Sequence, residues 1–175
     1  MPKLFVRQKA RRLWVERMES EFQEAVNRVS LLALANAYQP GKQALGDYAG
    51  KVDCEGSKRF TGSIDLDSAL KSSYPDSPRW DYGLGLQTSG QEIAVWVEVH
   101  PAHTSNVREV LNKLDWLKGW LQSQANALWR LTVRNRGRRY FWLATKGVHI
   151  RPGTPQARQL SRAGLELPRE WIVFR

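Results

Sequence analysis

The sequence predicts an α/β protein with a mixed sheet of about four strands flanked by helices, and three observations predict it. Two segments rich in apolar residues, 79–87 and 91–100, are separated by a turn signal, which is typical of an antiparallel hairpin. Apolar stripes at helical spacing come before and after this hairpin. Helices also separate the later strands, which is typical of crossover connections.

The first half of the chain contains one strong helical pattern and one weak region. Apolar residues at helical spacing predict a long helix over 10–38, which a Pro-Gly pair ends. Residues 40–78 are rich in loop residues, and within them only 64–67 alternates like a strand. We therefore expect a single domain over 1–175 with a less regular excursion at about 40–78.

The second half alternates helices and strands. A helix is expected to begin near Asn106, where an Asn-x-x-Glu sequence resembles a capping box, and its apolar stripe continues to Leu128. Residues 139–145 read as a buried strand. A Thr-Pro pair opens a short helix at Pro155, and residues 170–174 form the final strand.

Composition narrows the class of protein. The chain has 175 residues, of which 42% are hydrophobic and 25% charged, as expected for a globular domain with a substantial core. Cys54 is the only cysteine, which excludes a disulfide within the chain and suggests a reducing compartment. No apolar run approaches the roughly 20 residues that span a bilayer. We therefore expect a cytoplasmic protein.

The charge predicts a polyanionic partner. The net charge is +10, and nucleic acid is a more common partner of such a chain than a membrane surface. Basic residues cluster at 3–17 and at 130–139, and either cluster could instead be solvated surface. From the second cluster we select four candidate nucleic-acid contacts: Arg134, Arg136, Arg138 and Arg139. Such contacts supply affinity rather than sequence specificity.

The hairpin brings two acids together. If residues 89–90 form a two-residue loop, Thr88 pairs with Gln91, and counting back along both strands places Asp81 opposite Glu98. Like charges that face each other on a sheet are destabilising, and a bound cation is the simplest remedy. A longer loop would shift this register, and a chance pairing on a polar sheet face is the simpler alternative.

Strand periodicity adds neighbours to this pair. Glu98 and His100 point to the same face of their strand, and Asp81 shares its face with Gly83 and Gly85. Glycine weakens a strand interior, so two of them suggest the close approach of a backbone, a side chain or a ligand. A metal site at Asp81 and Glu98 is therefore the first functional hypothesis that the sequence suggests.

The order of elements, with its two acids, resembles the PD-(D/E)XK (restriction endonuclease-like) nuclease superfamily over roughly 10–175. The signature of that family is an acid on one strand followed by acid-x-lysine on the next, and the matching positions here are Asp81, Glu98 and His100. Two positions depart from the pattern. Trp80 stands where the family has proline, and His100 stands where it has lysine.

The resemblance implies a metal-dependent nuclease, with DNA preferred over RNA as substrate. Asp81 and Glu98, with the carbonyl of Val99, would bind Mg²⁺ or Mn²⁺, since hard cations favour oxygen ligands. His100 would act as a base, as an acid, or as a ligand favouring Mn²⁺. A missing family lysine could be replaced from the following helix, and we favour Lys113 over Lys118 because Lys113 is nearer the helix start.

Two other functions remain open. A catalytically inactive nuclease-fold protein would bind nucleic acid or a partner protein, with His100 marking the loss of catalysis. A subunit that needs another chain for activity is the third reading. The resemblance also implies a homodimer as a common state, and no membrane partner is expected.

Several other polar residues are weaker candidates. Glu19 matches a further acid that some members of the superfamily carry on the first helix, although a solvated glutamate is the simpler reading. Asp65 and Asp67 compete with Asp81 for the role of first acid. His103 is read as a loop residue or a phosphate contact, and His149 has no visible partner in the sequence.

Overall fold

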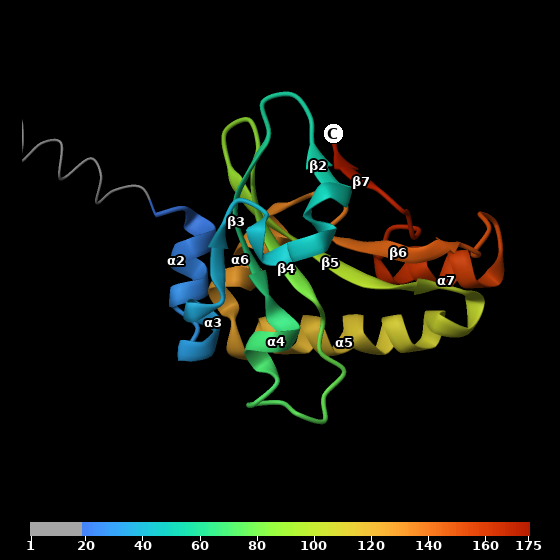
Figure 1. The fold of residues 1–175 in the computed structure, drawn as a ribbon, viewed down its shortest axis with the longest axis horizontal. Coiled ribbons are helices and arrows are strands. Elements are labelled where there is room, and N and C mark those ends of the chain that lie inside the picture. Colours follow the sequence, from blue (N-terminus) through green and yellow to red (C-terminus); the bar gives the residue numbers. More distant parts are fainter. Residues whose placement is uncertain (1–18) are drawn as a thin grey trace, which may run out of the picture.

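The computed structural model describes residues 19–175, and their main sheet has five strands in the order β1-β3-β4-β5-β6 (Figure 1). Neighbouring strands are antiparallel except for β5 and β6, which are parallel. The chain is therefore an α/β protein with a mixed sheet, one strand larger than the sequence predicts. The strands are β1 (Tyr38–Pro40), β3 (Arg59–Asp65), β4 (Tyr82–Gln87), β5 (Glu92–Ala102) and β6 (Tyr140–Val148).

The hairpin β4–β5 has the predicted register. Tyr82 pairs with Val97, and the same register continues to the loop. The Thr88 N–H donates to the Gln91 carbonyl at 2.8 Å, so the loop has the two residues expected. Gly90 adopts a φ of 103°, which favours glycine over other residues. The turn chemistry thus sets the alignment of every residue behind it.

The two faces of the sheet are covered differently. Helices pack on one face, and a 3₁₀ segment with a small second sheet packs on the other (Figure 1). Among the described residues no helix is long and apolar enough to cross a bilayer. On the helical side lie α2 (Glu21–Asn27), α3 (Leu32–Asn36), α4 (Leu66–Leu70), α5 (Val107–Gln124), α6 (Asn126–Arg134) and α7 (Pro155–Ala163).

Side chains from the helical face use the space left by the two strand glycines. A Cβ on Gly83 would lie 2.6 Å from the Trp96 ring. A Cβ on Gly85 would collide with Thr61 and with Phe22 of α2. The glycines therefore serve packing, the side-chain alternative among those that the sequence left open.

The predicted long helix over 10–38 is wrong in its described part. α2 ends at Asn27, and the next helix, α3, begins only at Leu32. The Leu31 N–H donates to the Val29 carbonyl at 2.7 Å across the break. The break reorients the chain, so that Leu34 is fully buried and Leu32 is 77% exposed. Residues 10–18 of the prediction lie outside the described residues.

The region expected to be an irregular excursion carries a strand of the main sheet. η1 (Gln43–Lys51) and β2 (Val52–Cys54) lead into β3, which pairs with both β1 and β4. The predicted strand over 64–67 is therefore wrong in extent, because β3 ends at Asp65. The Asp65 side chain accepts the Ser68 N–H at 2.9 Å and starts α4 there.

The second half differs in three local ways. The predicted single helix breaks into α5 and α6 at Ala125, whose φ of −133° is not helical. Asn106 makes no side-chain cap on α5; its Oδ1 accepts the His103 N–H at 3.1 Å instead. The final strand, β7 (Ile172–Phe174), pairs in parallel with β2 in a separate two-stranded sheet. α7 begins at Pro155 as predicted.

Candidate functional site

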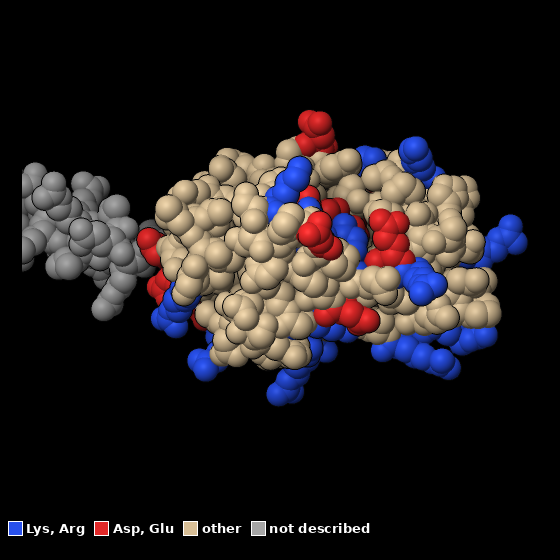
Figure 2. Space-filling model, turned by 90° about the horizontal axis from the view of Figure 1, so that it is seen from below, with Lys and Arg blue, Asp and Glu red and all other residues tan. Residues whose placement is uncertain are grey.

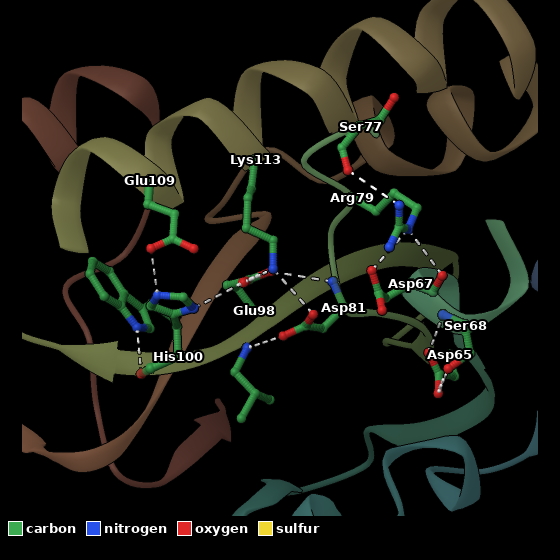
Figure 3. A network of polar contacts seen from close by, with 12 residues as sticks. Asp65, Asp67, Ser68, Ser77, Arg79, Asp81, Glu98, His100, Glu109 and Lys113 are labelled. Carbon is green, nitrogen blue, oxygen red and sulfur yellow. Dashed lines mark hydrogen bonds and ion pairs between the residues drawn. The ribbon is translucent and has the colours of Figure 1, made fainter. Parts of the chain in front are cut away.

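Two acids and a lysine meet between the hairpin and α5 (Figure 3). Asp81 lies directly before β4, Glu98 lies on β5, and Lys113 reaches across from α5. Lys113 Nζ is 3.2 Å from Asp81 Oδ1 and makes a second close ion pair with Glu98 Oε1. The cation that the opposed acids require is therefore supplied here by an ammonium group of the chain itself.

The backbone holds both carboxylates in position. The Asp81 N–H donates to Glu98 Oε2 at 3.3 Å, and the Val99 N–H donates to Asp81 Oδ2 at 2.9 Å. Each carboxylate thus accepts a backbone N–H at one oxygen and turns the other toward Lys113. Backbone donors cost little to position, so the two remaining oxygens are fixed before anything binds them.

Burial shifts the pKa values of all three side chains in this group. The Glu98 side chain is fully buried, and this burial, with the nearby Asp81 charge, raises the pKa of Glu98 well above 4.5 despite Lys113. Burial also raises the pKa of Asp81, against the opposing influence of Lys113. Burial lowers the pKa of Lys113, but Glu98 and Asp81 together outweigh it and raise that pKa.

His100 lies beside this group. Its Nδ1 is 3.7 Å from Glu98 Oε1, and its Nε2 is 3.2 Å from Glu109 Oε2. Glu109 lies on α5, and its predicted part in a capping box with Asn106 is wrong because its carboxylate contacts His100 instead. The imidazole therefore connects a buried carboxylate with an exposed one (Figure 3).

Lys118 does not join the site. Its Nζ donates to the Ala163 carbonyl at the end of α7 at 2.7 Å and lies over the Tyr140 ring. Burial lowers the pKa of Lys118. Of the two helix lysines considered from the sequence, the structure brings Lys113 to the acids.

The competing acids have other contacts. Asp65 caps α4, and Asp67 forms an ion pair with Arg79 at 3.0 Å. The α4 amides nevertheless border the site, because the Leu66 and Asp67 N–H groups donate to the Asp81 carbonyl. Glu19 is exposed ahead of α2.

The two remaining histidines lie together at the surface. The rings of His103 and His149 stack with centroids 4.4 Å apart. His149 Nε2 is 3.1 Å from the Lys146 carbonyl oxygen. His149, which lacked a partner in the sequence, therefore packs against the loop before α5.

The four arginines chosen as nucleic-acid contacts separate into two kinds. Arg134 donates to Glu21 Oε2 at 2.8 Å and to a carbonyl of β5, and Arg139 donates to the Asn135 carbonyl at 2.8 Å. Arg138 is half exposed and pairs with Glu166 at 3.0 Å, whereas Arg136 is exposed. Arg136 and Arg138 are thus the more accessible two. The basic cluster at 3–17 lies outside the described residues.

Charge is distributed unevenly on the face that carries α4 and α5. Acidic side chains gather near the middle of this face, and many Lys and Arg side chains lie along its edge (Figure 2). A polyanion approaching the middle of this face would meet like charge. The acids there would attract a cation before they could attract a polyanion.

Glu92 is a structurally important residue that the sequence did not predict. This glutamate is 4% exposed, and its carboxylate accepts the Glu21 N–H at 2.8 Å and the Phe22 N–H at 3.1 Å, besides the Thr61 hydroxyl. It fastens the start of α2 to the sheet. Strand alternation could have found it, because Glu92 shares the face of Glu98.

The acids suit a hard divalent cation that takes part of its ligands from elsewhere. Among residues 19–175 no group of three or more His, Cys, Asp or Glu side chains is placed to hold a metal ion. Mg²⁺ typically uses one or two carboxylates, with water and substrate phosphate as the other ligands. Asp81 Oδ1 and Glu98 Oε1 fit that pattern, since both already contact one cationic group.

Comparisons of this chain with models of protein families, with curated proteins and with solved structures gave no match.

Proposed function

We propose that this protein is a metal-dependent phosphodiesterase that cleaves nucleic acid, with DNA preferred, on a restriction endonuclease-like fold. One observation carries the proposal: Asp81 Oδ1 and Glu98 Oε1, the carboxylate oxygens that accept no backbone N–H, converge on a single cationic group, Lys113 Nζ. An acid directly before β4, an acid on β5 and an ammonium group are the chemical groups that the family resemblance requires.

The element order supports the same conclusion. An antiparallel hairpin, β4–β5, is followed by helices and then by β6, which pairs in parallel with β5. Helices α2 and α3 precede the sheet strands, and α5 and α6 form the crossover from β5 to β6, which fits the order that the resemblance implies. Lys113 of α5 takes over the role of the lysine that His100 replaces.

The residues have distinct roles in this proposal. Asp81 and Glu98 would hold Mg²⁺ or Mn²⁺ through oxygens that backbone N–H groups orient. The bound metal would supply Lewis acidity and a lowered pKa for the attacking water. Lys113 orients that water or neutralises charge that develops on the phosphate. His100, in contact with Glu109, is positioned to accept or give a proton at the edge of the site.

The second candidate is a catalytically inactive protein of the same fold that binds nucleic acid or a partner protein. Its specific support is that Lys113 already forms ion pairs with both acids from within the chain. Opposed carboxylates can therefore persist without a metal. His100 in the family's lysine position favours this reading as well.

The test is cleavage of supercoiled plasmid, single-stranded DNA and RNA with Mg²⁺, Mn²⁺ or a chelator. Wild type is compared with Asp81→Ala and Glu98→Ala, and Glu24→Ala on the exposed side of α2 serves as the control. The proposal expects metal-dependent cutting that both site variants lose and the control keeps. Binding of DNA by wild type without any cutting would support the second candidate instead.

A further inference from the structure

We propose that Lys113 is an exchangeable occupant of the cation position: its ammonium closes the site without metal and moves to the phosphate side when a divalent cation binds. This inference rests on the proposed function and adds its regulation. It makes the loading of metal and the positioning of the catalytic ammonium a single event.

The fixed frame around Lys113 is the first argument. Glu98 Oε2 and Asp81 Oδ2 accept N–H groups of Asp81 and Val99, so neither carboxylate needs to turn when the occupant changes. Only the lysine must move. Its stem has four carbons with free rotation, and its base is on α5 rather than on the sheet.

Burial supplies the second argument. The Glu98 side chain has no exposed surface, whereas the side chains of Asp81 and Lys113 are 21% and 14% exposed. Solvent does not reach Glu98 to stabilise its charge, so a charged Glu98 needs a cation beside it at all times. Of these three side chains, only Asp81 and Lys113 reach solvent. A metal ion therefore enters where the ammonium leaves.

Charge explains why the exchange suits a phosphodiester. The two carboxylates and Lys113 sum to one negative charge, which repels nucleic acid. The addition of a divalent cation, with Lys113 still nearby, changes the sum to one positive charge, which attracts one phosphate. The site would therefore accept its substrate only after the metal.

A tethered cation is also a competitor. Lys113 is held at high effective concentration beside the acids, so it lowers the apparent affinity for any free metal ion. Lys113→Gln removes the charge and keeps hydrogen-bond donors of similar reach. We expect Lys113→Gln to bind Mn²⁺ about tenfold more tightly than wild type, and to cleave about 100-fold more slowly through loss of the ammonium.

The experiment is a titration of the metal-free protein with Mn²⁺. Binding is measured by calorimetry and by the electron paramagnetic resonance signal of free Mn²⁺. Wild type is compared with Lys113→Gln, with Lys113→Arg, which keeps the charge, and with the double variant Asp81→Asn/Lys113→Gln. The inference is supported if Lys113→Gln binds Mn²⁺ more tightly than wild type and neither of the other two variants does. Equal affinity of wild type and Lys113→Gln, or no binding by either, overturns it.

A second measurement needs no variant that might fail to fold. Nitrogen-15 spectra of the lysine ammonium groups in wild type follow Lys113 directly, because a buried, ion-paired ammonium exchanges its protons slowly. The inference expects Mg²⁺ to remove this slow exchange. A Lys113 signal that stays unchanged while Mg²⁺ binds would contradict it.

The two proposals fail separately. Tighter metal binding by Lys113→Gln with no nucleic-acid cleavage by any variant would keep the exchange and reject the nuclease. Metal-dependent cleavage by wild type with equal metal affinities would keep the nuclease and reject the exchange.

Discussion

Asp81 and Glu98 are joined through the backbone: the Asp81 N–H donates to Glu98 Oε2 at 3.3 Å, and the N–H of the residue after Glu98 donates back to Asp81 at 2.9 Å. The register of the hairpin therefore builds the site directly. A slip of one residue would move Glu98 to the opposite face of β5, away from Lys113. The two-residue loop at 89–90 is for this reason part of the site's construction.

Stability should depend on pH through Glu98. Its pKa is raised in the folded protein, so the folded state binds more protons than the unfolded state above pH 4.5, and the stabilising contribution declines as pH rises. Glu98→Gln lacks this titration. The stability of wild type relative to Glu98→Gln should therefore fall as the pH rises above 4.5. Urea unfolding of both proteins checks this; parallel pH profiles would refute it.

Glu92 should stabilise the fold without serving the site. Glu92→Gln leaves one side-chain oxygen to accept from three donors, and its amide NH₂ would face donors where the carboxylate now accepts from them. We expect a loss of about 2 kcal/mol in the free energy of unfolding. Glu109→Gln, at a mostly exposed carboxylate, is the control and should lose less than about 0.5 kcal/mol. Equal losses in the two variants would show that the α2 contact is unimportant.

The glycines offer a matched pair. Gly83→Ala places a Cβ 2.6 Å from the Trp96 ring and should destabilise the protein by about 2 kcal/mol. Gly119→Ala lies in α5 with open space around it and should stabilise by up to about 1 kcal/mol. Thermal unfolding distinguishes them, and two shifts in the same direction would be inconsistent with this packing.

The arginines should divide by role. Arg136→Ala should weaken DNA binding and reduce the slope of log affinity against log salt by about 1, because an exposed arginine can neutralise a phosphate. Arg139→Ala should instead lower the free energy of unfolding, since Arg139 donates to backbone carbonyls. Fluorescence anisotropy at several salt concentrations, beside urea unfolding, tests both. An unchanged slope in Arg136→Ala would remove this loop from the nucleic-acid interface.

The parts of the fold that local chemistry determines were predictable. The turn residues set the hairpin register, the Thr-Pro pair opened α7, and strand alternation placed Glu98 and His100 on one face. The nearness of Lys113 to the helix start favoured it over Lys118. These features depend on residues close in sequence, so the sequence alone expresses them.

The missed parts depend on distant contacts. The alternation in β3 is interrupted at Gly62, which faces the Tyr38 ring, and the polar Ser63 is buried because it accepts the Ala44 N–H. β7 joins β2 from the far end of the chain. Likewise, the break between α2 and α3 places Leu34 in the core. No local pattern predicts such partners.

The nuclease proposal is tested most directly by the cleavage rate of supercoiled plasmid, measured against Mg²⁺ or Mn²⁺ concentration for wild type and Glu98→Gln purified in parallel. The substituted glutamine keeps the shape of the side chain but loses the charge that a cation requires. A metal-dependent nuclease with Glu98 as a metal ligand should show saturable, metal-dependent cleavage by wild type and at least about 100-fold less by Glu98→Gln. Equal rates for the two proteins, or no cleavage by wild type with either metal, would contradict it.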